Sequence, residues 1–169
     1  MKHLIFKASF DTTSVIITIA VFILFSFLGY NNVKSILNSK SGMFPWYNLG
    51  MLAFIIVFFL AMYLFSIKNY EITEDKFLIN RPIGKISINL ADIKAYKIYD
   101  PSIAVESMRS FGNGGIFGYY GKFYNPNIGS MTYYTTQKKN RILIMTFQGD
   151  KIVISPDDST IVDHFHKIK

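Results

Sequence analysis

Residues 49–67 read LGMLAFIIVFFLAMYLFSI, a run of 19 positions without a charged side chain. An α-helix rises about 1.5 Å per residue, so a helix of this length would extend about 28 Å, close to the thickness of a bilayer's hydrocarbon core. No polar face interrupts the run, as one would in the surface helix of a soluble protein. The run predicts a membrane-spanning helix over about residues 47–67.

A second apolar run lies closer to the N-terminus. No Asp, Glu, Lys or Arg occurs between Asp11 and Lys34, and residues 15–28 are almost entirely Val, Ile, Leu and Phe. This run predicts another span over about residues 12–30. No small-residue cleavage site follows it, which favours a retained anchor over a cleaved signal peptide. The alternative for both runs is a pair of helices buried in a soluble core, which the lack of a polar face disfavours.

Residues 1–69 are therefore predicted to form a two-helix transmembrane hairpin, with no Asp, Glu, His, Lys or Arg inside either span to indicate ion or proton transport. Tyr30 closes the first span and Trp46 and Tyr47 open the second, at the interfacial positions that aromatic rings favour. Basic residues are more frequent outside the hairpin than in its loop, which places both termini in the cytoplasm by the positive-inside rule. The flanking residues are Lys2, Lys7, Lys68, Lys76, Arg81 and Lys85, against Lys34 and Lys40 in the loop.

The composition excludes several classes of site. Cysteine is absent, which excludes disulfides, thiolate metal sites and cysteine nucleophiles. The net charge is +7, but from residue 68 onward 14 basic residues stand against 10 acidic ones. We therefore expect no nucleic-acid binding, and we expect the exposed cations to be solvated or to face anionic lipid headgroups.

Short apolar runs separated by turn signals predict a mainly β domain over residues 70–169. Ile86, Ile88 and Leu90 alternate with polar residues, which is the period-two pattern of a half-buried strand. Frequent polar turns join neighbouring strands into hairpins and indicate an antiparallel sheet. Seven strands are expected, near residues 70–72, 77–79, 86–90, 93–99, 131–136, 141–147 and 151–154.

The chain is predicted to end in an α-helix over residues 156–168. Ser155 suits the N-cap, Pro156 suits the first helical position, and the carboxylates of Asp157 and Asp158 would face the positive end of the helix dipole. Apolar residues then recur at helical spacing, at Ile161, Phe165 and Ile168. This apolar face is expected to cap one end or side of the sheet.

Three segments resemble bacterial PH-domain membrane proteins: FGNGGIFGYYGKF at 111–123, RILI at 141–144 and ISPDD at 154–158. The resemblance covers about residues 70–169. It implies a PH-like barrel. Together with the spans, strands and terminal helix predicted above, this gives two N-terminal transmembrane α-helices, expected in the bacterial inner membrane, followed by a mainly β PH-like domain. That domain would have about seven antiparallel strands in a partly open barrel and a C-terminal capping α-helix. The family has no catalytic motif and no agreed ligand residues to transfer to this chain.

Residues 109–124 hold five glycines and six aromatic residues and allow three interpretations. The favoured one is a long loop folded over the barrel, whose aromatic side chains complete the core. In the second, the loop is interfacial, and Phe117, Tyr119 and Tyr120 lie among lipid headgroups beside Arg109 and Lys122. The third is a nucleotide-binding loop, which lacks the Lys-Ser/Thr of a P-loop and its strand-then-helix context.

No catalytic, metal or cofactor site is expected. His164 and His166 are two positions apart on the predicted helix, so they point to different faces and cannot easily share a metal. No serine can be paired with a histidine and a carboxylate by a recognised spacing. We expect the chain not to be an enzyme.

The sequence predicts a membrane-anchored, non-enzymatic PH-like module that binds a partner protein or the anionic lipid surface at the cytoplasmic face. The alternative is a structural or assembly subunit, which forms homo-oligomers or scaffolds a neighbouring membrane protein. The candidate interaction residues are Arg109, Phe117, Tyr119, Tyr120, Lys122, Lys138, Lys139 and Arg141.

Overall fold

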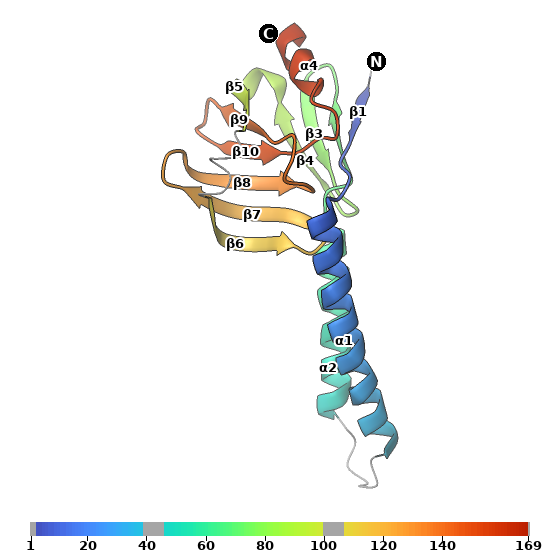
Figure 1. Cartoon of the computed structure of the whole chain (residues 1–169). Coiled ribbons are helices and arrows are strands. Elements are labelled where there is room, and N and C mark those ends of the chain that lie inside the picture. The colour runs from blue at the N-terminus through green and yellow to red at the C-terminus, as the bar shows by residue number, and fades with distance from the viewer. Residues whose placement is uncertain (1–2, 39–45, 100–106, 169) are drawn as a thin grey trace.

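Two long helices extend from one end of a β domain (Figure 1). The computed structural model describes residues 3–38, 46–99 and 107–168, with the side chains of residues 166–168 left out. The helices are α1 (Thr12–Asn38) and α2 (Trp46–Leu64), and both are long and apolar enough to span a membrane. Almost none of their surface is buried within the structure, so their apolar side chains need other apolar groups around them.

Ring contacts set the register of the two helices. The rings of Phe22 and Phe59 lie 5.6 Å apart, and those of Phe25 and Phe58 lie 5.3 Å apart. Because the helices run antiparallel, this register places Thr18 beside the last turn of α2. The first turn and a half of α1 therefore extends past α2 toward the β domain.

The helices differ from the predicted spans only at their ends. α1 continues to Asn38, whereas the prediction stopped near residue 30. α2 ends at Leu64, three residues before the predicted end. The hydroxyl of Ser66 donates to the carbonyl of Tyr63 at 2.7 Å, which occupies a carbonyl at the helix terminus.

The β domain consists of two sheets. The first has four antiparallel strands in the order β1-β2-β3-β4, and a short 3-10 helix, Leu90–Asp92, leads from β4 to the second sheet. The second has six strands in the order β5-β9-β10-β8-β7-β6. Its neighbouring strands are antiparallel except β8 and β10, which are parallel. The strands are β1 Leu4–Lys7, β2 Asn69–Ile72, β3 Lys76–Asn80, β4 Lys85–Asn89, β5 Ile93–Ile98, β6 Met108–Gly115, β7 Gly118–Asn125, β8 Gly129–Thr135, β9 Ile142–Thr146 and β10 Lys151–Ile154.

One apolar core joins the two sheets. Tyr70, Phe77 and Ile79 of the first sheet and Ile144 and Ile154 of the second are fully buried in it. Alternate residues of β2, β3, β9 and β10 face this core, as period-two patterning requires. All seven predicted strands are present, and the predicted fold class is confirmed. Strands β1, β6 and β7 were not predicted, and the parallel pairing of β8 with β10 departs from the expected antiparallel sheet.

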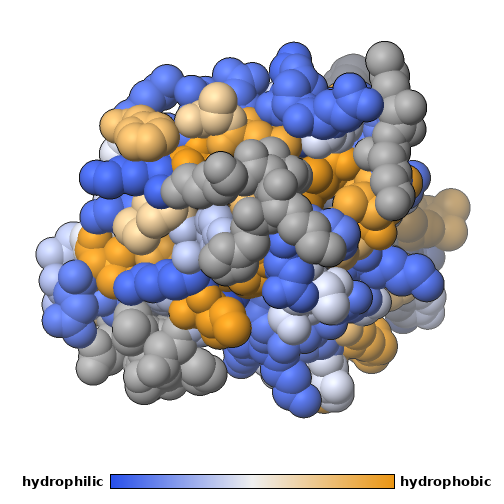
Figure 2. Space-filling view, turned by 90° about the horizontal axis from the view of Figure 1, so that it is seen from above, coloured by the Kyte–Doolittle hydropathy of each residue, from blue (hydrophilic) through white to orange (hydrophobic). Residues whose placement is uncertain are grey.

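The C-terminal helix, α4 (Ile161–Ile168), caps the core but begins five residues later than predicted. Ile161 and Phe165 are buried, and the ring of Phe165 lies 5.5 Å from that of Phe77. The hydroxyl of Ser155 accepts from the backbone N–H of Thr136 at 2.9 Å rather than capping a helix. Hydrophilic side chains cover much of this end of the domain, with apolar side chains between them (Figure 2).

Strand β1 is a feature that the sequence did not predict. It precedes the first apolar helix, yet it pairs with β2 and completes the four-stranded sheet. Phe6 and Ala8 belong to the core. The predicted domain boundary between residues 69 and 70 stays a prediction. The structure joins residues 4–7 to the same sheet as β2, so a fragment that begins at β2 would lack part of the core.

We expect the Glu71→Gln variant to be less stable than the wild type at neutral pH, by less than about 1 kcal/mol. Hydrogen bonds from Asn80 and then His3 hold the pKa of Glu71 below its ordinary value of 4.5. A depressed carboxyl pKa stabilises the folded state above the unfolded pKa, and this contribution is lost as the pH falls through the folded pKa. Chemical denaturation in detergent should therefore show that the difference in the free energy of unfolding between wild type and variant becomes smaller when the pH is well below 4.5. A difference that does not depend on pH would contradict this expectation.

Candidate functional site at the helix and hairpin junction

Residues 108–125 form a β-hairpin, β6–β7, at the edge of the six-stranded sheet nearest the helices (Figure 1). The favoured prediction of a long loop was therefore wrong. Gly112 and Gly121 face each other across the hairpin with φ angles of 119° and 129°. A Cβ on Gly121 would lie 2.3 Å from the carbonyl oxygen of Phe111. The glycines thus allow two strands to approach closely, which no other residue would permit here.

The turn of the hairpin is fastened to the start of α1. The hydroxyl of Ser14 donates to the carbonyl of Gly115 and accepts from the N–H of Gly118, both at 2.8 Å. The N–H of Phe117 donates to the hydroxyl of Thr18 at 3.0 Å. Ser14 is completely buried, so these bonds form where water does not compete for the same groups.

The hairpin also contacts the end of α2. The hydroxyl of Tyr120 donates to the carbonyl of Met62 at 2.9 Å. Phe117 has φ 53°, a left-handed conformation that is rare for a bulky residue. Its ring packs on Phe10 at 6.4 Å and on Tyr63 at 6.0 Å. Contacts on several sides hold this unfavourable backbone in place.

Asp11 connects the helix start to the β domain. Its carboxylate caps α1 by accepting from the N–H of Ser14 at 2.7 Å. The same carboxylate accepts from the hydroxyl of Tyr119 at 3.2 Å and from the N–H of Lys138 at 3.1 Å. One side chain therefore joins α1, strand β7 and the turn after β8.

Cations and rings pack together next to Asp11. The Cζ of Arg141 lies 5.6 Å from the ring centroid of Tyr119 and 5.1 Å from that of Tyr133, and the Nζ of Lys138 lies 5.8 Å from that of Tyr119. These distances are in the cation–π range. Burial lowers the pKa of Arg141, and burial followed by the charge of Asp11 raises the pKa of Tyr119 to about 12. Tyr119 is therefore a neutral donor at physiological pH.

A cavity of about 510 Å³ lies between the hairpin and the C-terminal part of α2. Its volume is in the range of ligand sites, and most of its lining is apolar. Phe58 precedes the end of α2 by six residues, or about 9 Å along the helix, so the cavity extends along α2 away from the β domain. The lining residues are Phe58, Met62, Phe65, Arg109, Phe111, Gly112, Asn113, Ile116, Tyr120 and Gly121.

The outer edge of β6 exposes two large apolar side chains. Met108 is 74% exposed and Phe111 is 79% exposed. Arg109 lies between them in the sequence and is also exposed. A Cβ on Gly114 would lie 2.3 Å from Nη1 of Arg109, so the guanidinium lies over Gly114. Apolar side chains beside a cation are the combination expected at lipid headgroup level.

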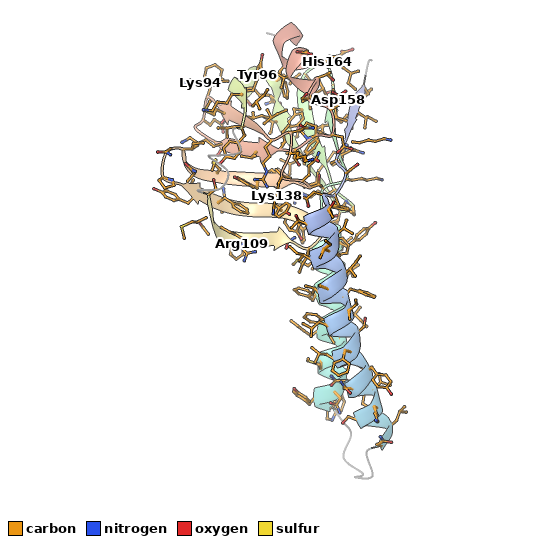
Figure 3. All side chains as sticks on the ribbon, in the orientation of Figure 1. Lys94, Tyr96, Arg109, Lys138, Asp158 and His164 are labelled. Atoms are coloured by element: carbon orange, nitrogen blue, oxygen red, sulfur yellow. The ribbon has the colours of Figure 1, made fainter. Side chains whose placement is uncertain are left out.

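The structure divides the eight predicted interaction residues into three groups. Arg109, Phe117 and Tyr120 line the cavity or contact the helices, with Arg109 and Lys138 both near the helix end of the domain (Figure 3). Tyr119, Lys138 and Arg141 come together around Asp11, but Tyr119 and Arg141 are buried and so add little to the exposed surface. Lys122 and Lys139 are exposed, and Nζ of Lys122 donates to Thr132 at 2.8 Å.

Sequence reasoning missed the helix residues of the junction. Asp11 directly before an apolar run is an N-cap signal that could have been recognised. Ser14 and Met62 carried no such signal, because their partners lie 101 and 58 residues away. Within residues 3–38, 46–99 and 107–168, no group of three or more His, Asp or Glu side chains could hold a metal ion.

A comparison with protein-family models finds one for the bacterial PH domain, which matches residues 68–168. The match begins just before β2 and includes strands β2–β10 and all of α4, while β1 and the two apolar helices precede it. No curated protein and no solved structure is significantly similar to the chain. The chain belongs to the bacterial PH domain family.

Proposed function

We propose that this chain is a non-enzymatic binding module anchored in the bacterial inner membrane by α1 and α2, with both termini in the cytoplasm. Its β6 edge, formed by Met108, Arg109 and Phe111, contacts the anionic headgroups of the membrane that holds the helices. One observation carries the proposal: the hairpin is bonded to both helices, to α1 through its turn and to α2 through Tyr120 of β7, so the β6 edge has a fixed position beside them.

The helix register supports a headgroup position for this edge. Thr18 lies beside the last turn of α2 and accepts from the N–H of Phe117 in the hairpin turn. If α2 spans the bilayer, its last turn lies near the membrane boundary, and so does the hairpin turn. Phe117 and Tyr63 are then an aromatic pair at the interface, where such rings are favourable.

The sheet order separates the β6 edge from the rest of the domain. Strands β7, β8 and β10 lie between β6 and β9. At a strand spacing of about 4.8 Å, β9 is about 19 Å from β6. Charges at that distance are largely screened from a membrane surface at physiological salt. Only β6 and its immediate neighbours in this sheet therefore lie close enough for electrostatic contact with the headgroups.

An environment-sensitive fluorophore on Met108→Cys tests the proposal, because the wild-type chain has no cysteine that would also be labelled. With the full chain in nanodiscs, lipids that carry a nitroxide on the headgroup should quench the fluorescence of this label. The quenching should be stronger when the bilayer contains phosphatidylglycerol than when it contains only phosphatidylcholine. Adding Arg109→Glu should weaken the contact more than about fivefold, since each basic residue near an anionic surface contributes about 1 kcal/mol and the new carboxylate is repelled by the same surface.

A label on Phe147→Cys is the matched control. Phe147 is 69% exposed and directly follows β9, so its label should remain unquenched in both lipids. Equal quenching at the two positions would contradict the proposed orientation. A Met108 label that stays unquenched in every bilayer would overturn the lipid contact and leave the edge free for a protein partner.

A further inference from the structure

We infer that the cavity between the β6–β7 hairpin and α2 binds one anionic phospholipid from the surrounding membrane. An acyl chain lies along α2, and the phosphate lies at the guanidinium of Arg109. This inference rests on the proposed function and names the ligand of the same site.

The shape of the cavity suits a lipid chain better than a water-soluble ligand. Its apolar wall runs from Phe65, just past the end of α2, to Phe58 inside the helix. If α2 spans the bilayer, that direction leads from the headgroups into the hydrocarbon region. A ligand that lines this wall must be apolar over most of its length.

The charge at the cavity suits a phosphate. Arg109 lines the cavity, and among the described residues no carboxylate lies within ion-pair distance of it. A guanidinium donates two parallel hydrogen bonds to a phosphate, which gives both affinity and orientation. No described carboxylate therefore competes with an external anion for the Arg109 side chain at the membrane end of the domain.

A second guanidinium lies close to the cavity wall. The Cζ of Arg81 is 5.9 Å from the ring centroid of Phe65, which lines the cavity. The Nε of Arg81 is buried and has no hydrogen-bond partner among the described residues. A buried donor without an acceptor is costly, and an anionic headgroup close by would lower that cost through its charge.

Gly114 sets the position of the Arg109 guanidinium. A Cβ at Gly114 would lie 2.3 Å from Nη1, which is the flexible end of a side chain. The φ of Gly114 is outside the left-handed region, so alanine fits the backbone. Gly114→Ala should therefore move the guanidinium with little change in the melting temperature.

Native mass spectrometry of the full chain in a mild detergent tests the inference. The wild type should retain one phospholipid, and added phosphatidylglycerol should replace it more readily than phosphatidylcholine does. Ile116→Trp, which fills the cavity, should lower retention about tenfold. Ile98→Trp is the matched control, because Ile98 is 67% exposed on β5 and outside the cavity. Arg109→Gln and Gly114→Ala should each lower the preference for phosphatidylglycerol about tenfold.

Retention by Ile116→Trp at the wild-type level would overturn the inference. If that variant does not fold, an unchanged lipid preference in Arg109→Gln and Gly114→Ala would overturn it instead. Quenching of the Met108 label, measured on the same variants in nanodiscs, distinguishes a failure of this inference from a failure of the proposed function. If Ile116→Trp loses its phospholipid while the Met108 label is still quenched, a discrete lipid site is supported. If Ile116→Trp retains its phospholipid while the Met108 label is still quenched, the inference fails and only the surface contact of the proposed function stands.

Discussion

Gly121→Ala is expected to lower the free energy of unfolding by about 4 kcal/mol, through a strained backbone and an overpacked pair of strands. Gly121 has φ 129°. A Cβ there would lie 2.3 Å from the carbonyl oxygen of Phe111 and 2.7 Å from Cα of Gly112. Both neighbours are backbone atoms of the facing strand, so the strands themselves must separate. Thermal or chemical unfolding of the full chain in detergent measures this loss.

Gly149→Ala separates the effect of backbone strain from that of the close contact. Gly149 also has a positive φ, 92°, but a Cβ there would have no atom within 4 Å. Its alanine variant should therefore lose only about 1 to 2 kcal/mol. Equal losses at Gly121 and Gly149 would contradict the assignment of Gly121 to a close strand contact.

Asp11→Ala is expected to lower the free energy of unfolding by about 3 kcal/mol, of which about 1 kcal/mol is the lost helix cap. The remainder comes from the N–H of Lys138 and the hydroxyl of Tyr119, which lose their acceptor. Because burial raises the pKa of Tyr119 to about 12, this hydroxyl stays protonated and needs an acceptor at neutral pH. Unfolding of the full chain in detergent gives the total, and hydrogen exchange should show faster opening at the start of α1 and in β7.

Asp11→Asn is the matched control for the charge. Asparagine caps a helix about as well as aspartate and keeps one acceptor oxygen. We expect this variant to lose about 1 kcal/mol, because the negative charge near Arg141 is removed and the amide nitrogen cannot accept from the N–H of Lys138. If Asp11→Ala lost no more than Asp11→Asn, Asp11 would be a simple cap and not a connection between α1 and the β domain.

The strands that face the main core could be predicted because their burial follows the sequence pattern. β3 and β4 carry apolar residues at every second position, and their buried residues are Phe77, Ile79 and Ile88. The hairpin β6–β7 lacks this signal, since glycine occupies many of its positions. Its strands depend on the fit of Gly112 against Gly121, and that fit is visible only once the pairing is known.

Two local signals were overridden by contacts with distant parts of the chain. Ser155 has the residue type of an N-cap, but its hydroxyl accepts from Thr136 of the neighbouring strand region instead. Asp157 accepts from the N–H and hydroxyl of Ser9, at 2.9 and 2.6 Å, and so holds the N-terminal segment to the domain. A side chain that can accept a hydrogen bond from a nearby backbone N–H can equally well accept one from a distant part of the chain.

The candidate site was predicted in part. The basic and aromatic composition of residues 109–124 indicated Arg109, Phe117 and Tyr120, which lie at the helix and hairpin junction. The cavity could not be predicted, because part of its apolar wall comes from Phe58 and Met62 of α2. From the sequence, those α2 residues are indistinguishable from the other lipid-facing residues of an apolar helix.

The depth of the β6 edge relative to the bilayer tests the central claim most directly. Nitroxide labels at Phe111→Cys and Phe147→Cys of the full chain in nanodiscs can be compared by their accessibility to oxygen and to a water-soluble nickel complex. The Phe147 label should behave as a group in water. The Phe111 label should lie at headgroup depth, with higher oxygen accessibility and lower nickel accessibility than the Phe147 label, but without the near-complete exclusion of nickel that marks the hydrocarbon core. A Phe111 label with the accessibility of the Phe147 label would contradict the account.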